Sequence, residues 1–186
     1  TSKRPWIKTS AGVLIPFGAI PMFHVHKSSV DQATITTGTY TLASNVTSLS
    51  NLISTLGTFS PGGFGWTGTV FTINGGTISG SGTLTGTTYT QTGGTVTLGG
   101  TMTLTGASAI SGGTLDLNGQ SVTGGTTLAL SSAGVVNLSG QFNNSSTITL
   151  SGGTTNDTGT SGEYKGTTFS CTGGSHTVRK MTLSST

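Results

Sequence analysis

Residues 93–111 read GGTVTLGGTMTLTGASAIS, and residues 112–132 read GGTLDLNGQSVTGGTTLALSS. Both stretches begin with a glycine pair, a threonine and then apolar residues that alternate with polar ones. The same kind of beginning recurs along the C-terminal part of the chain, at Gly75, Gly93, Gly112, Ala133, Gly152 and Gly173. The separations are 18, 19, 21, 19 and 21 residues. A period of about 20 residues is typical of coils that stack on one another.

Within each repeat, a short apolar-polar alternation returns every six or seven residues, as at Val96, Met102 and Ile110. Three short strands per coil indicate a triangular cross-section. The alternation in residues 95–98 directs valine and leucine inward and threonine outward. Glycine and asparagine suit the corners, where a positive φ is often needed. The sequence therefore predicts an all-β fold, a triangular β-solenoid of about 20 residues per coil, over residues 75–186.

Other β-architectures share some of these features. An antiparallel sandwich also has short strands and regular turns, but it does not explain a 20-residue period that stays in phase. An intertwined trimeric fibre and a trimer of single-chain solenoids both have Gly/Thr-rich repeats, and the sequence does not separate them from a single solenoid.

The composition sets further limits. Only 6% of the 186 residues are charged, against about 25% in average soluble domains, and Asp116 is the only charged residue between Asp31 and Asp157. Binding to nucleic acid requires a clustered basic face, so we expect no nucleic-acid partner.

The single cysteine, Cys171, excludes an intramolecular disulfide. No apolar run reaches the ~20 residues of a membrane span. The start at Thr1 fits a lost initiator methionine and a cleaved leader equally well.

The first 74 residues differ from the repeats. Residues 1–33 contain three prolines and much of the positive charge, and they predict an extended N-terminal arm. Residues 34–74 are expected to form a cap or transition region. Apolar residues within 45–56 follow helical i, i+3, i+7 spacing and predict a short amphipathic helix that caps the solenoid; they are Val46, Leu49, Leu52, Ile53 and Leu56.

The arm is the candidate interaction site. Its apolar residues need a surface to cover them, which is either the chain's own domain or a partner. Apolar and basic side chains together make up the candidate docking set, which is Lys3, Arg4, Trp6, Ile7, Lys8, Phe17, Ile20 and Phe23.

Catalytic and metal chemistry find little support. Glycoside hydrolysis normally uses two neighbouring carboxylates, and the chain has four acidic residues, of which Asp116 and Asp157 fall about two coils apart. We predict no catalytic residues, no cofactor and no enzymatic activity. His24 and His26 would face the same side of a strand and could share a metal, but solvated or partner-contacting histidines are the better interpretation.

Threonine-x-threonine strings resemble the threonine ladders of insect-type ice-binding solenoids. Such a ladder needs the same phase in successive coils. The sequence pairs Thr95 and Thr97 with Thr114 and Asp116, and then with Val136 and Leu138. The ladder would break at that point, which leaves ice binding as a remote alternative.

The GGTxTxxG coils resemble the passenger domains of bacterial adhesins and the fibre, spike or decoration proteins of tailed bacteriophages. Adhesin passengers are usually much longer, so the combination of a short repeat body and an arm favours the phage group. This resemblance implies a non-enzymatic virion protein, a capsid decoration (cement) or head-fibre protein. We expect a homotrimer on the virion surface that docks on a major capsid or tail protein. The alternative is a receptor-binding spike or a bacterial surface adhesin that contacts cell-surface glycans.

Overall fold

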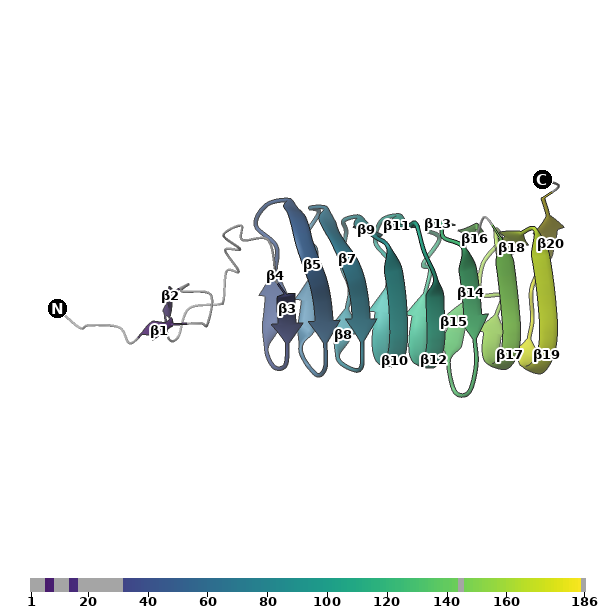
Figure 1. The fold of residues 1–186 in the computed structure, drawn as a ribbon, viewed down its shortest axis with the longest axis horizontal. Helices are drawn as coiled ribbons and strands as arrows, with labels where there is room; N and C mark the ends of the chain where they lie inside the picture. Colours follow the sequence, from purple (N-terminus) through teal and green to yellow (C-terminus); the bar gives the residue numbers. More distant parts are fainter. Residues whose placement is uncertain (1–5, 9–13, 17–31, 144–145, 185–186) are drawn as a thin grey trace.

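The computed structural model describes residues 6–8, 14–16, 32–143 and 146–184. Within these ranges the chain contains β-strands and no helix. From residue 32 onward the strands pair in parallel and stack as a solenoid of about eight turns (Figure 1). The predicted β-solenoid is therefore confirmed.

Each turn of the solenoid contributes to three faces, so the cross-section is triangular. The first face contains β3 (Gln32–Ile35), β5 (Val46–Ser54), β7 (Trp66–Ile73), β10 (Thr88–Thr97), β12 (Ser108–Asp116), β14 (Thr127–Leu130), β17 (Thr147–Asn156) and β19 (Thr168–His176). The second contains β4 (Thr39–Thr41), β6 (Thr58–Ser60), β8 (Thr77–Ile78), β15 (Val135–Asn137) and the C-terminal parts of β10, β12, β17 and β19.

The third face contains the N-terminal parts of β5 and β7, followed by β9 (Leu84–Gly86), β11 (Met102–Leu104), β13 (Val122–Gly124), β16 (Gln141–Asn143), β18 (Glu163–Gly166) and β20 (Lys180–Leu183). Separately, β1 (Trp6–Lys8) pairs in an antiparallel manner with β2 (Leu14–Pro16).

The coil length read from the sequence agrees with the strand pairing. On the second face Thr77, Thr95, Thr114, Val135, Thr154 and Ser175 are successive partners. Their numbers differ by 18, 19, 21, 19 and 21 residues, as do the repeat starts in the sequence.

The predicted helix over residues 45–56 is wrong. Residues Val46–Ser54 form β5, which pairs with β3 on one side and with β7 on the other. Val46 and Leu52 are buried in the core, whereas Leu56 is 78% exposed. Hydrogen bonding to two neighbouring coils is available only to a strand, and it outweighs a helical spacing of a few apolar residues.

The predicted cap or transition region is also revised. The stack begins at Gln32 and includes residues 34–74, which supply β4 to β7 and the second half of β3. The solenoid is thus longer than the expected 75–186, because its first coils carry fewer glycine pairs and lack the sequence signature of the later repeats.

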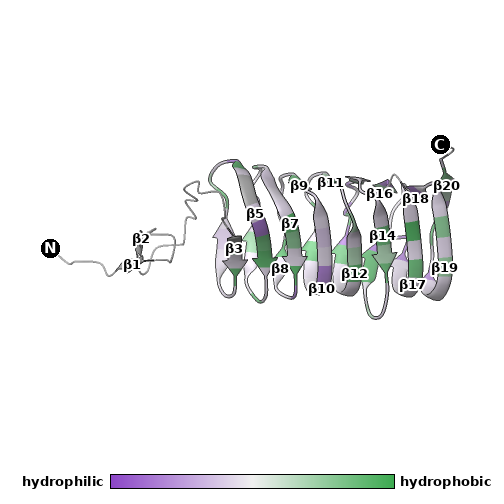
Figure 2. Ribbon diagram, in the orientation of Figure 1, coloured by the Kyte–Doolittle hydropathy of each residue, from purple (hydrophilic) through white to green (hydrophobic). Residues whose placement is uncertain are grey.

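Alternating side chains build one continuous core. Six apolar residues of two successive repeats are all at most 1% exposed, namely Val96, Met102, Ile110, Leu115, Val122 and Leu128. Figure 2 shows short hydrophobic and hydrophilic bands that follow one another along the strands. Stacked coils place each inward side chain on the equivalent residue of the next coil, so the core runs the length of the solenoid.

The glycine corners permit this close stacking. A Cβ atom on Gly112 would lie 2.2 Å from the carbonyl oxygen of Thr92 in the preceding coil. The next residue, Gly113, has a φ of 73°, which favours glycine. The glycine pair therefore supplies both the space and the backbone conformation that the corner requires.

Candidate functional site

The predicted docking arm is described only in part. Trp6, Ile7 and Lys8 form β1, and Trp6 pairs with Pro16 across the two-stranded sheet. The remaining predicted docking residues, Lys3, Arg4, Phe17, Ile20 and Phe23, lie outside the described residues, as do the histidines His24 and His26. The docking hypothesis for these residues stays a prediction.

The second face of the solenoid carries a column of hydroxyl side chains, which we call the threonine face. Its members are successive partners on eight coils, and they are Thr39, Thr58, Thr77, Thr95, Thr114, Val135, Thr154 and Ser175. A second polar column runs beside it and includes Thr41, Ser60, Thr97, Asp116, Asn137 and Asn156. In the first column Val135 alone lacks a hydroxyl group.

This register corrects the phase expected from the sequence. Thr114 pairs with Val135 and Asp116 pairs with Asn137, one residue earlier than Val136 and Leu138. A shift of one residue moves a side chain to the other side of a strand. Val136 and Leu138 therefore lie in the core, fully buried. The first column is interrupted only at Val135, and the second continues through Asn137.

The geometry of the threonine face is regular. Neighbouring strands lie about 4.8 Å apart, and alternate residues of one strand lie about 6.6 Å apart. The two columns thus form a flat array of hydroxyl and amide groups with little charge. Within it, Asn156 Nδ2 donates a hydrogen bond to Asn137 Oδ1 at 3.1 Å. Such an array can bind ordered water or a polyhydroxylated ligand, because each group both donates and accepts.

The charged residues of the described solenoid gather near its C-terminal end, where the side chains of Glu163 and Asp157 are both largely buried. Gln141 Nε2 donates to its Oε2 at 3.0 Å, Thr182 Oγ1 donates to its Oε1 at 2.5 Å, and Lys180 Nζ lies 3.2 Å from Oε1. The Thr182 hydrogen bond, and then the Lys180 contact and charge, hold the pKa of Glu163 below its ordinary 4.5, against the opposing effect of burial.

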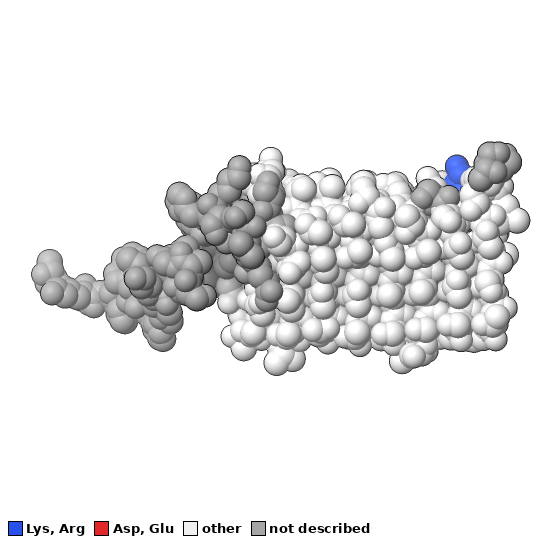
Figure 3. All heavy atoms as spheres, viewed as in Figure 1, with Lys and Arg blue, Asp and Glu red and all other residues white. Residues whose placement is uncertain are grey.

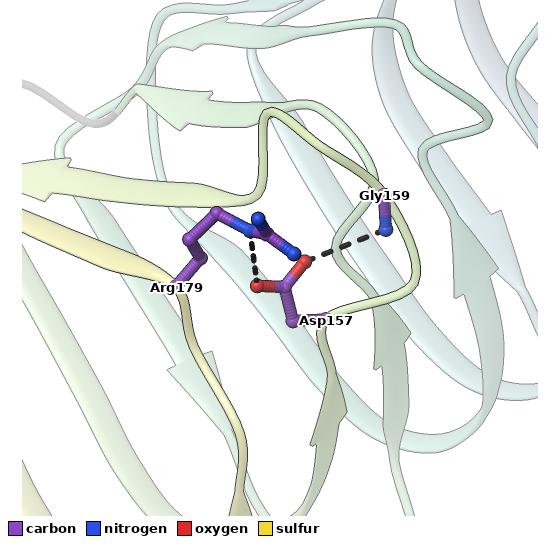
Figure 4. A network of polar contacts seen from close by, with 3 residues as sticks. All are labelled: Asp157, Gly159 and Arg179. Atoms are coloured by element: carbon purple, nitrogen blue, oxygen red, sulfur yellow. Dashed lines mark hydrogen bonds and ion pairs between the residues drawn. The ribbon is translucent and has the colours of Figure 1, made fainter.

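A second ion pair lies close to this group. Arg179 Nε is 3.1 Å from Asp157 Oδ2, and the backbone N–H of Gly159 donates to Asp157 Oδ1 at 3.4 Å (Figure 4). The face drawn in Figure 3 shows one small basic area near the C-terminal end and no acidic atoms. Apart from Asp116, the charged residues of the described rod lie in its last two coils.

A network of polar side chains lies in the same two coils and involves Thr155, Tyr164 and His176. The hydroxyl groups of Thr155 and Tyr164 lie 2.9 Å apart, and Thr155 Oγ1 lies 3.1 Å from His176 Nδ1. His176 Nε2 lies 2.8 Å from the carbonyl oxygen of Gly173. Burial raises the pKa of Tyr164, and the hydrogen bond with Thr155 partly opposes that rise. Thr155 is almost fully buried, so its hydroxyl group is not positioned to attack a substrate.

The carboxylates that the sequence offered for catalysis are not brought together. Asp116 Oδ1 accepts a hydrogen bond from the backbone N–H of Asn118 at 2.8 Å. Asp157 lies roughly 10 Å further along the stack, two coils away, and pairs with Arg179. Asp31 lies outside the described residues. The described part of the chain contains no group of three or more His, Cys, Asp or Glu side chains arranged to hold a metal ion.

The Glu163 and Asp157 groups were not predicted as sites. The sequence signal was the return of charge after residue 156, but the partners Gln141 and Thr182 are 22 and 19 residues away from Glu163 and are neighbours only through stacking. In the ranges that the structure covers, no helix could cross a membrane.

Comparison with known proteins gives no assignment. No protein-family model, no curated protein and no solved structure matches the chain.

Proposed function

We propose that this chain is a non-enzymatic structural protein of a virion, a capsid decoration or head-fibre protein. The observation that carries the proposal is the rod itself, in which eight coils share one core and present outer faces that are mostly neutral and rich in hydroxyl groups. A rod of this kind suits projection from a surface. It holds no gathered catalytic side chains among the residues described.

The N-terminal arm supplies the attachment in this proposal. Residues such as Trp6 and Ile7 would bury apolar surface against a major capsid or tail protein, and Lys8 would pair with acidic groups there. Three chains around a symmetry axis would place three arms on one site, which multiplies their effective concentration at the shell. We therefore propose a homotrimer on the virion surface.

Deletion of residues 1–31 tests the attachment. We expect the truncated chain to retain its β-sheet circular dichroism and its cooperative unfolding, because the stack begins at Gln32. It should no longer co-sediment with particles from which the native protein has been stripped. Co-sedimentation of the truncated chain at the level of the full chain would contradict the docking role.

A narrower control separates docking from general loss of the arm. Trp6→Ala with Ile7→Ala removes two apolar side chains and leaves the rest of the arm in place. We expect reduced particle binding, by about tenfold or more if these residues form the centre of the interface. Mass measurement of the full chain in solution distinguishes a trimer from a monomer.

Ice binding is a second candidate, because the register of the threonine face places a hydroxyl residue at seven of eight positions. Thr95→Tyr would disrupt the flat array at its centre, and Thr103→Tyr on the third face is the matched control. If the face binds ice, the first variant loses inhibition of ice recrystallisation and the second keeps it. If the full chain shows no inhibition, this candidate is excluded.

The same face also suits glycans, as expected of a receptor-binding spike or a bacterial adhesin. A glycan array with the full chain and with Thr95→Tyr tests this alternative. Binding that requires Thr95 would favour a receptor-binding role over a decoration role.

A further inference from the structure

The last described coil of the solenoid leaves apolar core positions uncovered. Met181 follows Val122, Phe142 and Tyr164 in one column of stacked residues, and those three are at most 1% exposed. Met181 itself is 56% exposed, and Leu183, two residues later, is 67% exposed. At the other end of the stack, Ala33, Ile35 and Leu42 are each only 4% exposed. The two ends therefore differ.

The same coil ends in an open strand edge. β20 pairs with β18, and β19 pairs with β17. No other described strand pairs with either of them on the outer side. An open edge of this kind is a template for another strand.

The positive charges of Lys180 and Arg179 at this edge favour the addition of a strand that carries a negative charge. Lys180 is stacked on Glu163, and Arg179 pairs with Asp157, so each carboxylate in the inner coil is followed by a cation in the last coil. The two cations are 65% and 58% exposed. A strand added outside β20 would place one residue beside Lys180, and a carboxylate there would pair with the exposed ammonium group whereas a cation would be repelled.

We propose that the outer edge of the last coil, formed by β20 with Met181 and Leu183, binds an extended acidic–apolar segment of a partner protein by parallel strand addition. The preferred segment carries a carboxylate beside Lys180 and apolar residues beside Met181 and Leu183. Backbone hydrogen bonds and the two apolar contacts supply affinity, and the carboxylate supplies specificity. This inference is independent of the role assigned to the arm.

A second copy of the chain fits this edge less well. Two C-terminal ends that face each other would bring two Arg179 and two Lys180 side chains together. A head-to-tail contact would use the first coil, whose apolar side chains Ala33, Ile35 and Leu42 are already covered. Charge and burial together favour a partner with a different, acidic sequence.

Two capped peptides test the proposal on the full chain labelled with ¹⁵N. The first, TEVTVT, has the expected pattern, and the second, TKVTVT, differs only in the charged residue. We expect the acidic peptide to shift the amide signals of residues 180–183 and to bind about fivefold tighter at low salt, with the difference falling as salt is added. Equal binding of the two peptides, binding of neither, or shifts confined to other coils would overturn the proposal.

Variants of the chain identify the contact. Lys180→Glu should reverse the preference and favour the basic peptide, and Lys180→Gln should remove the preference without repelling Glu163. Lys165→Glu on β18 is the matched control, since it changes the same charge one coil further in and should leave the preference for the acidic peptide. The amide spectrum of each variant reports whether the last coil stays folded.

If the free chain instead self-associates through residues 180–183, the edge serves copies of this chain and the proposal fails. If Lys180 serves only to prevent strand pairing at this edge, neither peptide will bind, and that result also contradicts the proposal.

Discussion

The middle coils and the last coil are built from the same repeat but differ in what surrounds them. In the middle, Leu115 and Leu128 are fully buried between two neighbouring coils. In the last coil, Met181 and Leu183 occupy comparable strand positions with a neighbour on one side only, and they are exposed. The two regions also differ in charge, because the described ion pairs lie in the last two coils.

This difference shows that the burial of a coil's apolar side chains depends on its neighbours as well as on its own sequence. In a stacked array, stability is approximately a sum of coil and interface contributions, so a terminal coil lacks one interface. The last two coils carry the ion pairs and the polar network around Glu163 and Thr155, which join the last coil to the one before it.

Truncation of a core leucine should give the largest contrast between the two regions. Leu115→Ala removes a fully buried side chain, and we expect a loss of about 2–5 kcal/mol in the free energy of unfolding. Leu183→Ala removes a side chain that is 67% exposed and should cost less than about 0.5 kcal/mol. Urea unfolding followed by circular dichroism measures both changes. Equal losses would show that the last coil is packed as tightly as the middle.

Removal of a buried tyrosine hydroxyl should give an intermediate effect. Tyr89 Oη donates to Gln91 Oε1 at 2.6 Å, while Gln91 Nε2 donates to the carbonyl oxygen of Thr114 at 3.0 Å. Tyr89→Phe leaves the fully buried Gln91 carbonyl without its donor, at a cost of about 1–3 kcal/mol.

Tyr164→Phe is the matched change near the C-terminal end. Thr155 keeps its contact with His176 Nδ1 in that variant, so we expect a smaller loss than for Tyr89→Phe. Thermal unfolding of the two variants decides the order. A larger loss at Tyr164 would place the main contribution of the network in the tyrosine rather than in the Thr155–His176 contact.

Acidification should give the smallest effect and one confined to the last coils. The pKa of Glu163 is lowered by folding, so its contribution to stability is present above pH 4.5 and is lost as the pH falls through the folded pKa. We expect the difference in melting temperature between the native chain and Glu163→Gln to shrink between pH about 7 and about 3. A constant difference over this interval would mean that the Glu163 carboxylate does not sense the Thr182 and Lys180 contacts.

Much of the fold could be predicted from residues 75–186, because glycine pairs mark one corner of most coils and apolar residues mark most inward positions. The strand Val46–Ser54 could not, since its apolar residues also fit helical spacing and its two partner strands, β3 and β7, are 19 or so residues away on each side. The threonine face was missed for a related reason. Assigning Val136 instead of Val135 to the outer column is an error of one residue, and only the pairing with Thr114 corrects it.

Some features of the candidate sites could likewise be read from the sequence, whereas others depend on the tertiary structure. The scarcity of charge along the rod is a property of the sequence, and so is the period that makes the rod. The partners of Glu163, the exposure of Met181 and Leu183, and the contrast between the two ends depend on which coils are neighbours. The sequence by itself determined the coil length, the corners and the alternation, because these are set by local conformation and polarity. The tertiary structure decided which side chains share a column and which edge stays open, because stacking joins residues that are about 20 positions apart.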